Sequence, residues 1–354
     1  MKRFQKHKII LGIAIALYCA LFIFLTLWKY YHFYYDNLDL AIFNNVFFNT
    51  LRGNFFAATI HPPTYLGDHF SPFIFLLIPF YALKPGPEIL LILETLAIGS
   101  TAVPIFGIAK KLIPKPHSLL PLGLTLLWLT NPLVHNMNFF EFELLPFAVL
   151  FLFMALYFYV TEKKVWFILA LILALLVRED VTLMTFAIGL LGWIDRRSAF
   201  WKWTPILLSI VYGAISFSVT SYYAPTGIYK FLVMYGWLGG TTAPTILLSF
   251  ITHPLKVLLH LLTWDNFVFI LGLTFPFFFL AITRSKYLIL LVLPLLQLWL
   301  TANGGSPLIL MTHFSGYLLV GLIMLLIDRI SHLESNNKWP RLIPSSLRNK
   351  KFLY

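Results

Sequence analysis

Charged residues are scarce in this sequence. Asp, Glu, Lys and Arg make up 11% of the 354 residues, against roughly a quarter in ordinary soluble domains. Apolar residues make up 59%, and the mean hydropathy is +0.82. This composition excludes a soluble globular fold and indicates an all-α polytopic membrane protein. Because its apolar segments would pack together in lipid, we expect one continuous helical bundle rather than two or three domains.

Cysteine is almost absent. The one thiol, Cys19, lies inside the first apolar segment, so neither an intramolecular disulfide nor a cysteine-based metal site is available. Bulky Leu17 and Tyr18 precede it, where a lipoprotein cleavage site needs a small residue. We therefore expect Cys19 to face lipid from an uncleaved helix.

Long apolar segments recur along the whole chain. Residues 1–8 carry four Lys or Arg and precede an apolar segment long enough to cross a hydrocarbon core of about 30 Å. A signal peptide is the alternative, but the segment is too long and lacks a small-residue cleavage site. We predict about ten transmembrane helices, at residues 9–28, 88–111, 118–134, 144–160, 165–177, 181–194, 203–222, 267–283, 287–301 and 314–327.

The basic residues predict the orientation of these spans. If the spans alternate from a cytoplasmic N-terminus, 20 of the 26 Lys and Arg fall on the cytoplasmic side, as the positive-inside rule requires. Both termini would then be cytoplasmic in a multi-pass protein of the cell membrane. The other six basic residues lie in the outer half: Lys29, Arg52, Lys84, Arg178, Lys230 and Lys256.

This distribution explains the net charge of +12 without a nucleic-acid partner. Residues 1–327 would form one transmembrane helical domain, with a first outer loop at 30–70. Residues 328–354 would form a basic cytoplasmic tail that contacts anionic membrane lipids. Most acidic residues fall in the outer loops, so we expect any chemistry at the outer face.

Interfacial helices are expected in two of the outer loops. Leu40, Phe43, Phe47 and Leu51 recur at helical spacing, which is typical of a helix lying in the membrane interface, and Gly53 would end it. Residues 71–83 are apolar but too short to span, which favours a surface-lying or re-entrant helix. The apolar stretch that begins at Pro244 would form another surface helix, with His253, Lys256 and His260 as its polar stripe.

The first outer loop holds five candidate site residues, Asp36, Asp39, His61, Asp68 and His69. Asp36 as N-cap with Asp39 in the first turn would stabilise the following helix electrostatically. The functional alternative is a carboxylate that takes a proton from an acceptor hydroxyl. Asp68 would either cap a helix or orient His69. Together with His61 and Asp39, this pair offers ligands for a divalent metal, although no tight ligand spacing supports such a site.

Three further groups lie in later outer loops. Glu141 and Glu143 stand among phenylalanines beside a span, where carboxylates are costly unless they are paired or functional. The second group is the charged turn Arg178, Glu179 and Asp180. It is either a plain turn or a site in which the guanidinium of Arg178 binds a phosphate while the two carboxylates hold it in place. The last group is a single residue, His313, which precedes the final span. Arg178 is the expected partner of the glutamates if their role is structural.

Four motifs together resemble the DUF2079 predicted membrane proteins, namely YDNLDLAIFNN, LGDHFSPFIFLLIPFYAL, FEFELLP and VREDV. The resemblance runs from about Tyr34 to His313. That group is similar to the GT-C superfamily of polytopic glycosyltransferases. The resemblance implies a GT-C-like bundle whose first outer loop carries an acidic catalytic residue, with a polyprenyl-phosphate sugar as donor.

Carried over by position, the resemblance implies particular roles. Asp39 matches the acidic residue of the first outer loop, acting as base or metal ligand, and Asp68 and His69 would support it. The sequence departs from the family at two places. The family often has FHPE-like residues where this chain has FEFE, and it often has a His-Tyr pair where this chain has His313 followed by Phe314. Substrate contacts would come from the remaining candidates: Asp36, Arg52, His61, Glu141, Glu143, Arg178, Glu179, Asp180 and His313.

A transporter or lipid flippase is the competing class. A carrier would keep polar groups near the bilayer midplane, and Glu94, partway into the second span, is the main residue of that kind here. A noncatalytic membrane scaffold is a third class. A scaffold predicts that Asp39→Asn removes only the small stabilisation that a negative charge in the first turn gives to a helix. The sequence predicts no oligomeric state.

Overall fold

The structure is a computed structural model that describes residues 2–35, 38–60, 64–114, 119–227, 229–240, 242–281, 284–302 and 307–336. Within these ranges the chain is helical, without any strand, and Ala57 and Thr64 form an isolated bridge. The first eight α-helices are α1 (Lys2–Tyr31), α2 (Asp39–Leu51), α3 (Ile74–Tyr81), α4 (Pro87–Ser100), α5 (Ala102–Leu112), α6 (Leu120–Leu129), α7 (Pro132–Phe139) and α8 (Leu145–Val160).

The second half of the chain continues in the same way. Its α-helices are α9 (Lys164–Val177), α10 (Val181–Ile194), α11 (Ala199–Tyr223), α12 (Ala243–Thr252), α13 (Pro254–Leu261), α14 (Trp264–Thr274), α15 (Ile289–Trp299) and α16 (Ser315–Asn336). Short 3₁₀ turns connect them at η1 (Tyr65–Gly67), η2 (Lys230–Leu238), η3 (Phe275–Phe277), η4 (Lys286–Leu288) and η5 (Pro307–Met311).

Four of the described helices are long and apolar enough to cross a membrane: Gln5–Tyr31, Pro87–Leu112, Ala199–Tyr223 and Ser315–Ser335. A bent pair of helices would make a fifth span, and five further apolar helices have 10–17 residues. The chain is therefore a helical membrane protein with four or five candidate spans. The prediction of about ten spans is not confirmed, because many of the predicted segments form helices too short to cross alone.

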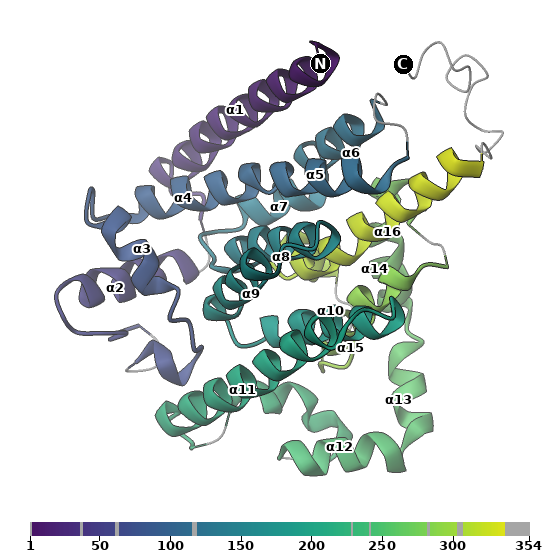
Figure 1. The fold of residues 1–354 in the computed structure, drawn as a ribbon. Helices are drawn as coiled ribbons and strands as arrows, with labels where there is room; N and C mark the ends of the chain where they lie inside the picture. The colour runs from purple at the N-terminus through teal and green to yellow at the C-terminus, as the bar shows by residue number, and fades with distance from the viewer. Residues whose placement is uncertain are drawn as a thin grey trace.

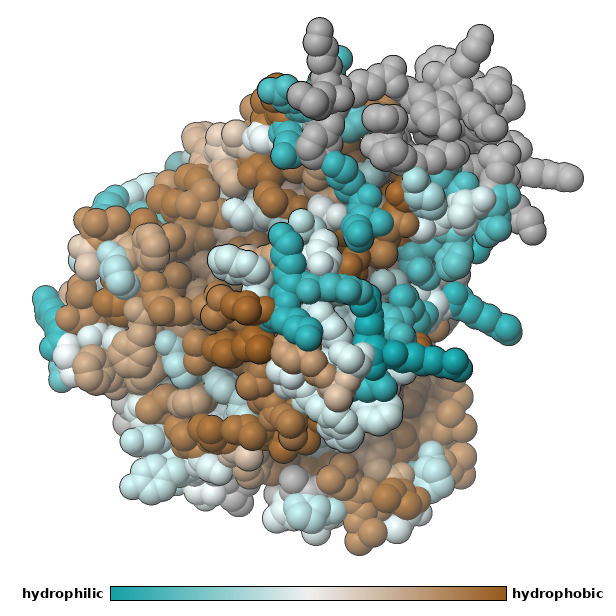
Figure 2. Space-filling model, viewed as in Figure 1, coloured by the Kyte–Doolittle hydropathy of each residue, from teal (hydrophilic) through white to brown (hydrophobic). Residues whose placement is uncertain are grey.

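The bundle is built around α16. In Figure 1 this helix runs from beside α8 near the centre toward the upper right, while α1 lies along the top and α11 crosses the lower part, above α12. Most of α16 is buried inside the protein, whereas little more than a quarter of α1 and of α11 is buried. Figure 2 shows hydrophilic residues gathered on the right of the visible face, toward the end of α16, and hydrophobic residues over much of the rest. Such an uneven distribution suits a protein with both lipid-facing and water-facing surface.

Close helix contacts depend on small residues. A Cβ added at Gly99 in α4 would lie 2.5 Å from Sγ of Cys19 in α1, so the two helices pack tightly at this point. Cys19 is only 8% exposed. The expectation that it faces lipid is wrong, because its side chain fills the interface between α1 and α4.

Prolines divide two segments that the sequence analysis treated as continuous. The predicted span at 118–134 is broken between α6 and α7, where the side chain of Asn131 accepts from the Leu133 amide and Pro132 begins the next helix. The predicted surface helix that begins at Pro244 is two helices, α12 and α13, bent by 90° at His253-Pro254. Proline lacks the amide hydrogen that would continue the preceding helix.

The C-terminal boundary also differs from the prediction. We expected the last span to end at residue 327, with a separate tail from 328, but α16 continues to Asn336. Its extra turns include Leu333 and Glu334, which are buried. Residues 337–354 of the predicted tail lie outside the described residues.

Candidate functional site

One end of the bundle gathers ionisable side chains from loops far apart in the sequence. They come from the end of η1, the α7–α8 connection, the α9–α10 connection and the short segment before α16. We call this group the loop cluster, and its members are Asp68, His69, Glu143, Arg178, Glu179, Asp180 and His313. All of these are residues that the sequence analysis singled out.

Arg178 is the centre of the cluster. Its side chain, at the end of α9, is 3% exposed and makes a two-point contact with Asp180, Nε to Oδ1 at 2.9 Å and Nη2 to Oδ2 at 2.7 Å. Tyr317 in α16 donates its hydroxyl to Oδ1 of Asp180 at 2.6 Å. Burial opposes ionisation of both partners, but their mutual attraction is stronger, so the pKa of Asp180 is lowered and that of Arg178 is raised well above its usual value. The pair is therefore ionised.

Glu143 occupies the other side of Arg178. Its Oε2 lies 3.9 Å from Nη1 of Arg178, and its Oε1 lies 3.5 Å from Nδ1 of His313. Burial raises the pKa of Glu143 to about 8; Arg178 opposes this shift and the nearby charge of Asp39 adds to it. Glu143 is therefore mostly protonated at neutral pH, with a pKa suited to accept or release a proton.

His313 is fully enclosed beside this carboxyl. Within the described part of the chain neither of its ring nitrogens has a hydrogen-bond partner. Burial, together with the positive charge of Arg178, lowers its pKa well below the usual value, so the imidazole is neutral. Its ring packs against those of Phe140 and Phe314, at centroid distances of 5.3 and 4.1 Å.

His69 and Glu179 form the more accessible part of the cluster. Nδ1 of His69 contacts Oε1 of Glu179 at 2.7 Å, and the other oxygen of Glu179 accepts from the amide of Phe70 at 3.1 Å. A carboxylate only accepts, so Nδ1 carries the hydrogen and Nε2 of a neutral ring carries the lone pair. The His69 side chain is 19% exposed, the largest fraction in the loop cluster. Its Nε2 lies 3.9 Å from Oδ1 of Asp68.

The start of α2 lies against the same region. Asp39 is half-buried in the first turn of α2, close enough to Glu143 to raise its pKa. The next residue, Leu40, donates its backbone amide to Oε2 of Glu141 at 2.7 Å. Glu141 is thus a structural partner of the α2 N-terminus, because it satisfies an amide that has no partner within its own helix.

The remaining predicted site residues lie elsewhere. Asp36 and His61 lie outside the described residues. The N-cap of α2 is Leu38, so the prediction of Asp36 as N-cap is wrong. Arg52 lies at the opposite end of α2, about 20 Å from Asp39 by helix geometry, with its guanidinium 3.8 Å from the centre of the Phe48 ring. It does not join the loop cluster.

Metal binding was one hypothesis for the acidic residues. Among the described side chains, no three His, Cys, Asp or Glu groups lie in an arrangement that could hold a metal ion. His61, one of the four predicted ligands, lies outside the described ranges.

Two tyrosines of this site were missed in the sequence analysis. Tyr317, which binds Asp180, lies in the first turn of α16, four residues after His313, and this closeness in the sequence is the one signal that could have identified it. Tyr229 donates its hydroxyl to Oε1 of Glu179 at 3.0 Å from the segment between α11 and η2. No periodic pattern surrounds Tyr229, so only the tertiary structure identifies it.

Comparison with known proteins places this geometry in a family. A family model described as "Predicted membrane protein (DUF2079)" matches residues 29–350, a range that includes every member of the loop cluster. Neither a curated protein nor a solved structure matches the chain. The chain belongs to the DUF2079 family of predicted membrane proteins.

Proposed function

We propose that the chain is a GT-C-like membrane glycosyltransferase, which moves a sugar from a polyprenyl-phosphate donor to an acceptor at the outer face of the cell membrane. The observation that carries the proposal is the loop cluster itself. Acid–base groups from four loops meet around one buried guanidinium, and burying so many ionisable groups together is costly. Buried groups with shifted pKa values of this kind are typical of functional sites.

Transfer to an acceptor hydroxyl requires a base. The acceptor oxygen attacks the anomeric carbon as its proton leaves, and the bond from that carbon to the donor phosphate breaks. We assign Asp39 as the base that takes the proton of the acceptor hydroxyl, since its side chain is only half-buried at the start of α2. His69 is the second candidate, because Glu179 fixes its ring and leaves Nε2 as the basic nitrogen.

The departing polyprenyl phosphate needs a cation. Arg178 uses Nε and Nη2 on Asp180, while Nη1 lies 3.9 Å from Glu143. We assign Nη1 to the leaving phosphate, since guanidinium N–H groups match phosphate oxygens well. Glu143, mostly protonated at neutral pH, adds little negative charge to oppose the phosphate.

The test is a transfer assay. Purified protein is given a labelled polyprenyl-phosphate sugar together with membrane lipid or glycan acceptors, and transferred label is counted for wild type, Asp39→Asn and His69→Gln. We expect transfer by the wild type and loss of at least about a hundredfold in the variant of the true base. Asp265→Asn, a change to another first-turn acid in α14, is the matched control. Full transfer by both site variants would refute the assignment of the base.

One observation favours a carrier as the second candidate. Glu94 is fully buried inside α4, next to a hydrogen-bonded set in which Thr95 donates to Asn138 and Asn138 donates to Tyr18. An ionisable residue inside a span is a common mark of transport pathways. Uptake of solute or flipping of lipid by the reconstituted protein, with no sugar transfer, would support the carrier.

A further inference from the structure

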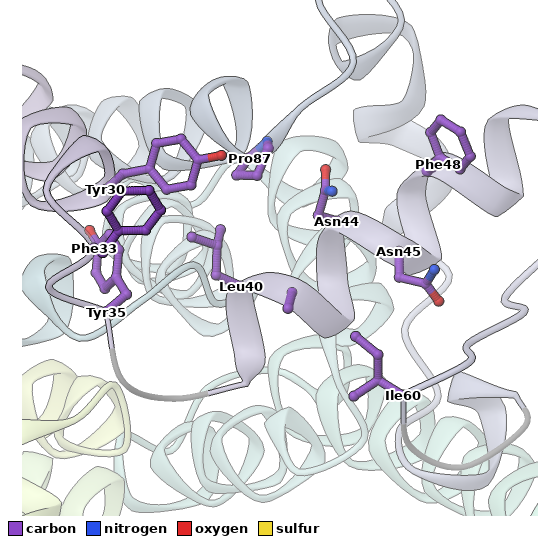
Figure 3. A pocket seen from close by; sticks show the side chains of 10 residues that line it. Tyr30, Phe33, Tyr35, Leu40, Asn44, Asn45, Phe48, Ile60 and Pro87 are labelled. Atoms are coloured by element: carbon purple, nitrogen blue, oxygen red, sulfur yellow. The ribbon is translucent and has the colours of Figure 1, made fainter.

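A groove of about 600 Å³ lies beside α2, where α1 ends and α4 begins. In Figure 3 aromatic side chains from the end of α1 stand on one side of it, the polar face of α2 crosses the middle, and the start of α4 lies behind. Its principal lining residues are Tyr30, Tyr35, Asn44, Asn45, Phe48 and Pro87. The ionisable side chains of the loop cluster do not line it, so it is a separate site with a size typical of ligand pockets.

Two asparagine amides give the groove its chemical character. Oδ1 of Asn44 accepts from the hydroxyl of Tyr81 at 2.7 Å, and Oδ1 of Asn45 accepts from the amide of Thr59 at 2.9 Å. These hydrogen bonds fix the orientation of both side-chain amides, and each amide oxygen already accepts a hydrogen bond. The NH₂ groups have no partner within the described residues, so the groove offers two oriented donors and calls for a ligand with acceptor oxygens.

Two basic residues contact aromatic rings that line the groove. Nζ of Lys29 lies 4.3 Å from the centre of the Tyr35 ring, and the guanidinium of Arg52 lies 3.8 Å from that of Phe48. Lys84 lies 3.5 Å from Glu88, the residue after Pro87. Two of the six basic residues assigned to the outer half, Lys29 and Arg52, thus contact rings that line this groove, while the charge of Lys84 is balanced by Glu88. The charge of Lys29 and Arg52 favours an anionic ligand over a neutral one.

The position of the groove indicates a ligand from the membrane. The first candidate span ends at Tyr31, beside the groove, and exposed aromatic residues follow it at once. Phe33 lines the groove and is 92% exposed, and Tyr34 is 57% exposed. Aromatic residues at the end of a span mark the level of the lipid headgroups. Exposed rings at this depth suit the upper part of an acyl chain.

We propose that this groove binds the phosphate ester headgroup of an anionic membrane lipid. The phosphate oxygens accept from the NH₂ groups of Asn44 and Asn45, and the two nearby cations draw in the charge. The acyl chains leave the groove past Phe33. Because α2 also begins at Asp39, a lipid held here braces the helix that carries the proposed base. The lipid site does not depend on the proposed glycosyl transfer.

Lipid titration followed by native mass spectrometry tests the site. Full-length protein stripped of lipid is titrated with phosphatidylglycerol, and separately with phosphatidylcholine or with inorganic phosphate as competitor. Asn44→Asp keeps an oxygen for Tyr81 but replaces the donor by a negative oxygen, and Asn45→Asp does the same beside Thr59. Asn54→Asp places the same charge on an exposed residue of the turn that follows α2.

We expect phosphatidylglycerol to bind the wild type about tenfold more tightly than phosphatidylcholine, with inorganic phosphate unable to displace it at similar concentration. Asn44→Asp and Asn45→Asp should each lose about tenfold in phosphatidylglycerol affinity, while Asn54→Asp stays within about twofold of wild type. Equal binding by all three variants would overturn the proposal. Equal affinity for the two lipids, or ready displacement by inorganic phosphate, would also overturn it. Binding is measured without transfer, so failure here is distinct from failure of the proposed function.

Discussion

The protonated state of Glu143 gives a quantitative prediction about stability. Its carboxyl has a pKa of about 8 in the folded protein, against a usual value of 4.5, because it is buried near Asp39 and only partly compensated by Arg178. A raised pKa means that the folded state holds a proton that the unfolded state has released. The stabilisation is fully present below pH 4.5 and is lost as the pH rises through 8.

The magnitude follows from the pKa shift. Between pH 6 and pH 9 the unfolded chain is ionised at this position throughout, while the folded protein loses its proton near pH 8. At about 1.4 kcal/mol for each pH unit, the wild type should lose about 3 kcal/mol over this interval because of Glu143. Glu143→Gln removes the titrating group but keeps the shape of the protonated form. The variant should therefore gain stability relative to wild type as the pH rises.

Thermal unfolding in detergent at a series of pH values measures the effect. We expect the melting temperature of wild type to fall more steeply than that of Glu143→Gln between pH 6 and pH 9. Glu162→Gln is the matched control, since its side chain is 65% exposed and its ion pair with Arg197 lies at the surface. Parallel curves for wild type and Glu143→Gln would refute the assignment of a protonated, buried carboxyl.

Other predictions follow from contacts in the cluster and in the bundle. Arg178→Met should destabilise the protein by about 3 kcal/mol, because it leaves the carboxylate of Asp180 buried without its cation, and the fall in melting temperature would show this. Tyr317→Phe should cost about 2 kcal/mol through loss of one hydrogen bond to that charge, and an unchanged melting temperature would contradict the bond. Gly192→Ala should cost about 1–3 kcal/mol, because the new Cβ would lie 2.5 Å from a backbone oxygen of α11. Gly123→Ala, which meets nothing within 4 Å, should be tolerated in the same assay.

The periodicity of apolar residues predicted where helices form, but it did not predict the residues at which they begin and end. The spacing of Leu40, Phe43 and Phe47 correctly predicted a helix, and all three side chains are buried in α2. The prediction of where that helix begins was wrong, because the Leu40 amide in its first turn is bound by Glu141, which lies 101 residues away in the sequence. Capping by a distant residue leaves no local signal.

The candidate site shows the same limit. Residue type and position predicted that His69, Arg178 and Glu143 belong to the site, because ionisable groups are rare in so apolar a chain. Their pairing could not be read from the sequence. Glu179 was expected to position Arg178 or a sugar hydroxyl, but its carboxylate instead binds His69, 110 residues away. The guanidinium is instead bound at two points by Asp180, with Glu143 at 3.9 Å on its other side.

Cross-linking between the first loop and the α9–α10 connection tests the central claim, that these distant segments form one site. The lone cysteine can be removed by Cys19→Ala, after which His69→Cys and Glu179→Cys place the only two thiols where the structure has a 2.7 Å contact. A short dithiol-reactive reagent should join these positions efficiently in the folded, membrane-embedded protein, and should fail to join the control pair Arg52→Cys and Glu179→Cys. Equal reaction of the two pairs, or none at His69 and Glu179, would contradict the account.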